Sequence, residues 1–237
     1  MLTARRSWDD GFTLIELVIT VTIMSIVTVA ITGVLFQYLR VSNESSARLN
    51  ESTDQQFVSA YWQQDVSSAG LRAGTPSLAL RPSVWKSGPA PSGVASACAS
   101  PAGTTVVGLA WNDYPSTTPS TAPEATWDAT ISAAVYFTKT VGTRTELWRT
   151  RCGSGSTTST PVAHLIDPAS LTDPATGMLD PTRIVSCAKD DGSTTSCTGV
   201  SPFPSTISIT LVVQDTGKAV PSGTGYTSTL TAETRQG

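Results

Sequence analysis

Apolar and polar residues follow two contrasting patterns along this 237-residue chain. From Phe12 to Phe36 nearly every residue is apolar, and Glu16 is the one charged residue in that stretch. As a helix, these residues would extend for about 37 Å, which exceeds the roughly 30 Å of a membrane's hydrocarbon core. The pattern therefore predicts a membrane-spanning helix over residues 12–36.

After Phe36, polar residues alternate with apolar ones, and no proline occurs through Ala69. We expect the helix to continue over residues 37–70 as an amphipathic segment, with an apolar stripe that covers a sheet. The stripe consists of Phe57, Val58, Tyr61, Trp62 and Val66. The expected helix terminators are Gly70, Gly74 and Pro76.

The composition of the chain and the structure that it predicts then change twice. Residues 71–104 are rich in Pro, Gly, Ser and Ala and predict a long exposed loop held by Cys98. Residues 105–237 predict a β-rich globular head, in which apolar and polar residues alternate along short segments. The predicted strands are residues 104–111, 129–139, 144–151, 205–214 and 226–235.

The predicted strands suggest how the sheet meets the helix. One strand carries Ile131, Ala133, Val135 and Phe137 on one face, and another carries Ile207, Ile209, Leu211 and Val213. A turn at residues 141–143 is expected to reverse the chain between two of the strands. The apolar face of an antiparallel sheet would then lie against Phe57 and Tyr61, giving an α+β fold.

Composition narrows the class of protein. Only 14% of the residues are charged and the net charge is −3, while Thr, Ser, Ala, Gly and Pro dominate after about residue 70. This composition is typical of exported β-rich domains. Nucleic-acid-binding proteins usually cluster Lys and Arg on one face, and this chain shows no such cluster, so no nucleic-acid partner is predicted.

Four cysteines, Cys98, Cys152, Cys187 and Cys197, all follow the apolar segment. An even number in an exported region predicts two disulfides, for which three pairings exist. The turn-forming pair Asp191-Gly192 favours a bond between Cys187 and Cys197, which leaves Cys98 for Cys152. The alternative is free, buried thiols in a reducing compartment. No C-x-x-C spacing occurs, so no metal is expected.

Two ordinary interpretations of the apolar segment leave Glu16 unexplained. A secretory signal peptide has a shorter apolar core of about 7 to 15 residues and ends in small residues, and Ala30 to Gly33 match that ending poorly. An uncleaved single-span anchor fits the length better. A carboxylate in a membrane helix is unfavourable by a few kcal/mol unless it has a partner, and Arg5 and Arg6 are poorly placed to be that partner.

The stretch "GFTLIEL", with Gly11, Phe12 and Glu16, follows a short leader containing Arg5 and Arg6 and precedes the apolar helix. It resembles the type IV prepilin motif of pilins, type II secretion pseudopilins and competence pilins. The resemblance implies removal of leader residues 1–11 by a prepilin peptidase, N-methylation of Phe12, and assembly into a filament with other pilin or pseudopilin subunits. Glu16 would neutralise the Phe12 amine of a neighbouring subunit.

The resemblance also implies a fold and a location. The type IV pilin-like fold packs a long N-terminal helix, with a membrane-spanning lower half, on an antiparallel β-sheet head. The expected location is the inner (cytoplasmic) membrane, single-pass with an exported head, and then a pilus or pseudopilus. Many pilins have a proline about twenty residues after the cleavage site, where this chain has Gly33. Glycine also weakens a helix, by about 1 kcal/mol relative to Ala.

Three further groups of residues are candidates for catalysis, calcium binding or adhesion. His164 is the only histidine and has apolar neighbours without a nucleophile motif, so no catalysis and no cofactor are predicted. Asp167, Asp173 and Asp180 each precede a proline, a pattern that favours turn starts over a calcium site. Scattered tryptophans such as Trp85, Trp111, Trp127 and Trp148 favour packing over an adhesive surface.

These observations predict a structural subunit of a type IV pilus or a type II secretion pseudopilus. The 226 residues left after processing, with a large loop-rich head, suggest a minor subunit that primes assembly near the tip. Glu16 argues against the tip pseudopilin class that lacks this acid. The alternatives are a single-span anchored binding protein or adhesin that does not polymerise, and a membrane-tethered enzyme that depends on His164.

Overall fold

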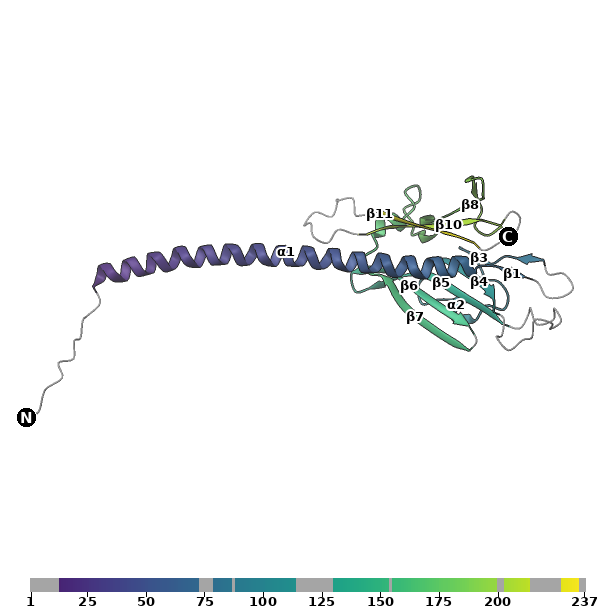
Figure 1. Cartoon of the computed structure of the whole chain (residues 1–237), viewed down its shortest axis with the longest axis horizontal. Coiled ribbons are helices and arrows are strands. Elements are labelled where there is room, and N and C mark those ends of the chain that lie inside the picture. The colour runs from purple at the N-terminus through teal and green to yellow at the C-terminus, as the bar shows by residue number, and fades with distance from the viewer. Residues whose placement is uncertain are drawn as a thin grey trace, which may run out of the picture. The chain divides into compact units, whose positions relative to one another are not determined.

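A computed structural model describes residues 13–72, 79–86, 88–113, 130–153, 155–199, 203–213 and 227–234 (Figure 1). The chain divides into two units, Met1–Arg48 and Leu49–Gly237. The first unit contains the N-terminal part of one long helix. The second contains the rest of that helix together with the strands, and we call it the head.

Helix α1 (Leu14–Ser68) has 55 residues and confirms the long N-terminal helix predicted from the sequence. Thr13 precedes its first residue, and no proline interrupts it. Gly33 lies within the helix without breaking it. The helix ends just before Gly70, whose φ of 149° favours glycine and whose N–H donates to the carbonyl oxygen of Ala110 at 3.0 Å.

The head contains a five-stranded antiparallel sheet in the order β3-β4-β5-β6-β7. Its strands are β3 (Val84–Trp85), β4 (Thr104–Asn112), β5 (Ile131–Val141), β6 (Arg144–Gly153) and β7 (Ser156–Ala163). A two-residue turn joins β5 to β6, and its Gly142 has a φ of 62°. The turn expected at residues 141–143 is therefore confirmed.

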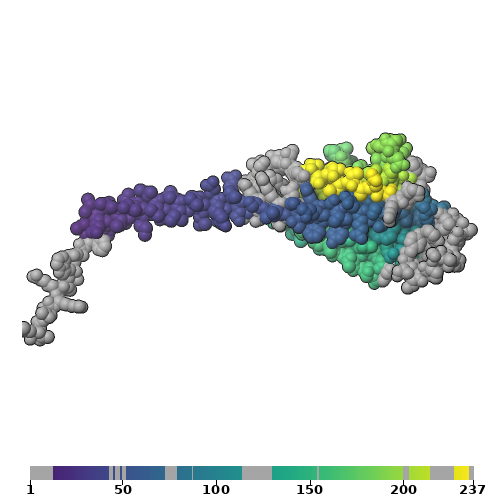
Figure 2. Space-filling model, in the orientation of Figure 1, coloured from purple at the N-terminus to yellow at the C-terminus, as the bar shows by residue number. Residues whose placement is uncertain are grey.

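A second antiparallel sheet has the order β11-β10-β8-β9. Its strands are β8 (Val185–Ala188), β9 (Thr194–Thr195), β10 (Thr206–Val212) and β11 (Thr227–Glu233). Figure 2 shows β11 in yellow on the surface of the head. The sequence predicted one antiparallel sheet, whereas the head contains two main sheets.

The C-terminal part of α1 packs against both sheets. The indole ring of Trp62 meets the ring of Tyr136 on β5 edge-on at a centroid distance of 5.2 Å. The indole N–H of the same residue donates to the carbonyl oxygen of Ile207 on β10 at 3.2 Å. The main core of the head therefore lies around this part of the helix, and Trp62 is fully buried in it.

The face of β5 that meets the helix is not the one predicted. Ala134 and Tyr136 share the core with α1, whereas Ala133, Val135 and Phe137 face a second core with Leu71, Trp85, Cys98 and Cys152. Both faces of β5 are buried, so the alternation in its sequence could not identify the helix side. Of the predicted stripe on the helix, Val58, Trp62 and Val66 are buried, whereas Phe57 is 54% exposed. Asp65 and Ala69 are also buried on this side.

The described parts of residues 71–104, a range expected to form a loop, contribute Leu71, Trp85 and Cys98 to the second core. This segment contains β1 (Leu71–Arg72), β2 (Leu80–Arg81), β3 and the one-turn helix α2 (Ser96–Ala99). The bond Cys98–Cys152 ties α2 to β6, and Cys187–Cys197 closes the chain around β8 and β9. Both are the pairings expected from the sequence, and neither leaves a free cysteine.

Candidate functional site

The N-terminal part of α1 is the candidate functional site. Leu14–Ser42 forms a stretch of 29 residues with a mean hydropathy of 2.5, long and apolar enough to cross a membrane. Its large apolar side chains are exposed, from Leu14 at 83% to Phe36 at 70% (Figure 2). Exposed apolar surface of this extent marks a segment that binds lipid or other apolar helices.

Five hydroxyl groups of this stretch are satisfied within the helix. Each bonds to a backbone carbonyl oxygen one turn earlier, as Thr22 does to Val18 and Ser25 does to Val21, both at 2.7 Å. Thr20, Thr28 and Thr32 do the same. A polar group without a partner is costly in lipid, so these bonds allow the hydroxyls to lie in an apolar environment.

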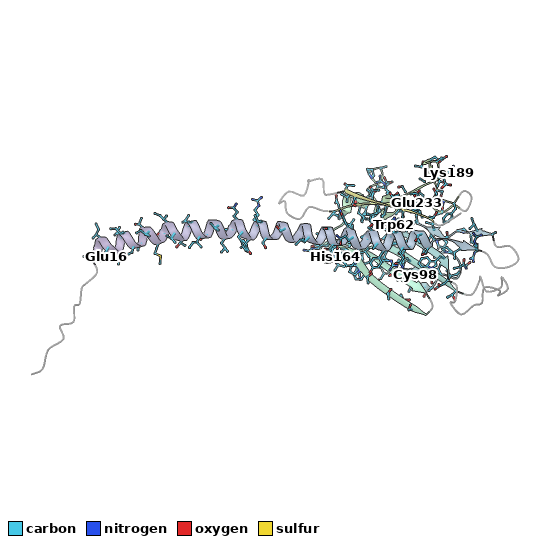
Figure 3. All side chains as sticks on the ribbon, viewed as in Figure 1. Glu16, Trp62, Cys98, His164, Lys189 and Glu233 are labelled. Carbon is cyan, nitrogen blue, oxygen red and sulfur yellow. A yellow bond between two sulfur atoms is a disulfide. The ribbon has the colours of Figure 1, made fainter. Side chains whose placement is uncertain are left out.

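Glu16 lies in the first turn of α1 (Figure 3). Its backbone N–H donates to the carbonyl oxygen of Thr13 at 3.1 Å and approaches the Thr13 hydroxyl at 3.4 Å. Thr13 and Glu16 thus have the spacing of a capping box, in which Ser or Thr at the N-cap precedes Glu by three residues. This local role was not identified in the sequence, although the pattern T-x-x-E was visible there.

The capping-box spacing is one explanation for an acid at position 16. A carboxylate at a helix N-terminus is stabilised by the helix dipole by roughly 0.3–1 kcal/mol. This is less than the few kcal/mol that a charge in an apolar environment costs. Among the residues whose side chains the structure describes, no basic group pairs with the Glu16 carboxylate. Gly11 and Phe12, the expected processing residues, lie outside the described residues.

The head contains a second polar cluster, which the sequence analysis missed. Asp65 on α1 is fully buried, and both of its carboxylate oxygens accept from Arg149 on β6, from Nε and Nη2, each at 2.6 Å. The hydroxyl of Tyr136 also donates to Asp65, at 2.8 Å. The sequence feature that could have revealed this cluster is a single acid, Asp65, within the apolar stripe of the helix.

Burial and charge shift the pKa values in this cluster. Burial, followed by the negative charge of Asp65, raises the pKa of Tyr136 well above 10. Burial lowers the pKa of Arg149, but the hydrogen bonds and charge of Asp65 outweigh it, so the guanidinium stays protonated. The cluster is therefore a closed ion pair with a neutral phenol, and its buried polar groups are satisfied.

His164 lies just after β7 and contacts the helix instead of a nucleophile (Figure 3). Its Nδ1 is 2.9 Å from Oδ1 of Asp54, and its backbone N–H donates to Oδ2 of Asp54 at 2.9 Å. Half of the imidazole is exposed. The geometry fits a contact that holds α1 against the end of β7.

The three Asp-Pro pairs begin turns, as predicted. The carboxylates of Asp167 and Asp180 accept the N–H groups of Ala169 and Thr182 at the starts of the 3₁₀ turns η2 (Pro168–Leu171) and η3 (Pro181–Ile184). The N–H of Ala175 and then the hydroxyl of Thr176 lower the pKa of Asp173. Among the described residues, no group of three His, Cys, Asp or Glu side chains could hold a metal ion.

Comparison with known proteins bears on the N-terminal stretch. Residues 9–32 match the family described as the prokaryotic N-terminal methylation motif. No curated protein matches the chain. The matched residues contain Gly11, Phe12 and Glu16 and run into the apolar part of α1. With its long apolar helix followed by antiparallel sheets, the chain fits a type IV prepilin-like protein.

Proposed function

We propose that this protein is a structural subunit of a type IV pilus or a type II secretion pseudopilus, and that it is a minor subunit that primes assembly. The observation that carries the proposal is the methylation motif at residues 9–32, which leads directly into an exposed apolar helix with an acid in its first turn. In the proposed pathway the helix first anchors the protein in the inner membrane and then packs against other subunits in the filament.

The proposed processing step is hydrolysis of the peptide bond between Gly11 and Phe12 by a prepilin peptidase. This cleavage releases the leader and frees the α-amino group of Phe12, which is then methylated. The amine would lie only four residues from Glu16 in the same chain. Two opposite charges that are each costly in an apolar bundle become acceptable when paired, so Glu16 of one subunit would attract the amine of another.

Mass spectrometry of the membrane-extracted protein tests the processing. We expect the mature N-terminus to be Phe12, with a methyl group on its nitrogen. An intact N-terminus at Met1 would overturn the proposal and favour an anchored binding protein that does not polymerise. Quantitative mass spectrometry of purified filaments tests the minor role, for which we expect far fewer copies of this chain than of the most abundant subunit.

Substitutions at Glu16 separate pairing from helix capping. Gln can replace Glu in a capping box, so Glu16→Gln keeps the capping role and removes only the charge. We expect Glu16→Gln and Glu16→Ala to insert in the membrane normally and to lose at least tenfold in the sheared filament fraction. Glu16→Asp retains the charge and serves as the matched control, with most incorporation kept. Normal incorporation of Glu16→Gln would show that the charge is not used.

A further inference from the structure

The apolar contacts of α1 in the head repeat with the period of the helix. Val58, Trp62, Val66 and Ala69 are at most 3% exposed and are spaced by four, four and three residues. Apolar packing is not directional, so helix positions one turn apart can occupy similar sites. The size of Trp62, the polar contacts of the helix and the hydrogen bond from Gly70 to Ala110 just after it distinguish one axial position from the next.

Asp65 is the polar residue that breaks this repeat. Its two donors, Arg149 and Tyr136, are directly opposite each other on neighbouring strands β6 and β5. Together they supply three hydrogen bonds of 2.6, 2.6 and 2.8 Å to a single carboxylate. The two parallel bonds from Arg149 fix the direction of the carboxylate as well as its position.

Arg149 also contacts the preceding turn of the helix. Its guanidinium carbon lies 4.7 Å from the centre of the Tyr61 ring, and Tyr61 is four residues before Asp65. The Arg149 side chain is only 6% exposed. If α1 moved by one turn, Tyr61 or Ala69 would replace Asp65, and a buried charge would lose its partner. Burying an unpaired charge is strongly unfavourable.

We propose that Asp65, Arg149 and Tyr136 set the axial register of α1 on the five-stranded sheet. The apolar stripe supplies the affinity of the helix for the head, and the ion pair selects one of the positions that the stripe allows. Buried polar groups fix register in this way in coiled coils. Because α1 is continuous from Leu14, its register also fixes how many helical residues precede the head.

The importance of a fixed number of helical residues before the head rests on the proposed function. A subunit whose helix slipped by one turn would have about 5.4 Å more or less helix before the head than a subunit in the observed register. Every copy of this subunit needs the same length of helix for its Glu16 to meet the same position on a neighbouring subunit. Asp65 and Arg149 are positioning residues in this sense, remote from the site that they serve.

Electron spin-resonance distance measurements on the full chain in detergent test the register. The described cysteines are all in disulfides, so two added cysteines can be labelled selectively. The exposed positions Gln63 on α1, Thr157 on β7 and Thr229 on β11 allow two pairs, 63 with 157 and 63 with 229. Two pairs are needed so that a movement along the helix axis changes at least one distance.

The decisive variant replaces Asp65→Leu together with Arg149→Met, because removing both charges avoids leaving one unpaired and favours folding. We expect a single narrow distance in the parent chain and a second population, displaced by up to about 5.4 Å, in this variant. Asp54→Asn is the matched control, since Asp54 is an acid on the same helix with a partly exposed contact, and should keep one distance. A single unchanged distance in the double variant would overturn the proposal.

A second measurement separates this inference from the proposed function. Mass spectrometry of the double variant should still find the N-terminus at Phe12, because the processing site is unchanged, while its filament incorporation falls. If the parent chain is not processed at all, the proposed function fails while the register result stands. If the distances show one register and incorporation is normal, the inference fails while the proposed function stands.

Discussion

Asp65 in the head is fully buried with its charge paired. Asp65→Asn would leave Arg149 as an uncompensated buried charge, and removing one partner of such a pair costs about 3–5 kcal/mol. We expect that loss in the free energy of unfolding of the head, measured by chemical denaturation.

Asp54→Asn is the comparison for that measurement. Its partner His164 is 49% exposed, and exposed ion pairs contribute only about 0.2–1 kcal/mol. We therefore expect a loss of about 1 kcal/mol or less. Equal losses for Asp54→Asn and Asp65→Asn would mean that burial does not govern the strength of these contacts.

The raised pKa of Tyr136 makes the head sensitive to alkali. Burial and the nearby charge of Asp65 keep the phenol protonated in the folded state, whereas an unfolded tyrosine has a pKa of about 10. The stability from this residue is therefore complete below pH 10 and is lost as the pH rises towards its folded pKa. We expect denaturation midpoints measured from pH 8 to 11 to fall, and to fall less steeply in Tyr136→Phe.

At the level of elements, the two disulfides differ in the length of chain that they close. Cys98–Cys152 spans 54 residues and Cys187–Cys197 spans 10. By the chain-entropy model, the longer loop stabilises by about 4 kcal/mol and the shorter by nearer 3 kcal/mol. We expect the double Cys→Ser variant at 98 and 152 to have the lower denaturation midpoint. The opposite order would show that the length of the closed loop does not decide how much each disulfide stabilises the head.

The elements that the sequence identified are those with a strong local pattern. Helix α1 begins with a nearly continuous apolar run and contains no proline. Strand β5 has a run of β-branched and aromatic residues, and β10 alternates β-branched residues with others. Strand β7 was missed because "STTSTPVA" contains few apolar residues, and its first six residues are exposed. It forms a strand because β6 offers it a hydrogen-bonding edge, and a single segment cannot reveal that neighbour.

At the level of the whole molecule, apolar surface is distributed unequally between the two units. Leu14–Ser42 exposes its apolar side chains, whereas both cores lie within residues 49–237. A fragment that begins at Leu49 should therefore stay soluble without detergent and retain both disulfides, as checked by gel filtration and mass spectrometry. The full chain, as the control, should require detergent. Aggregation of the fragment would show that the N-terminal unit contributes to the folded head.

The candidate site was predictable because its information is local. Gly11, Phe12 and Glu16 lie within six residues, and neither the motif nor the apolar stretch needs a distant partner. The cluster of Asp65, Arg149 and Tyr136 was not predictable from the sequence. Asp65 and Arg149 are 84 residues apart, and each is a residue type that is common on protein surfaces. The prediction of which face of β5 meets the helix was wrong for a similar reason, because that face is decided by residues that are distant in the sequence.

The disulfide between Cys98 and Cys152 has a consequence for timing. Both sulfur atoms lie in the interior, with 0% and 2% of these residues exposed, so a reductant in solution cannot readily reach the bond once the head has closed over it. Oxidation must therefore come before the last stage of folding. A head that closed while its thiols were still reduced would shield them from an oxidant, so we expect this bond to form before the head has closed over Cys98 and Cys152.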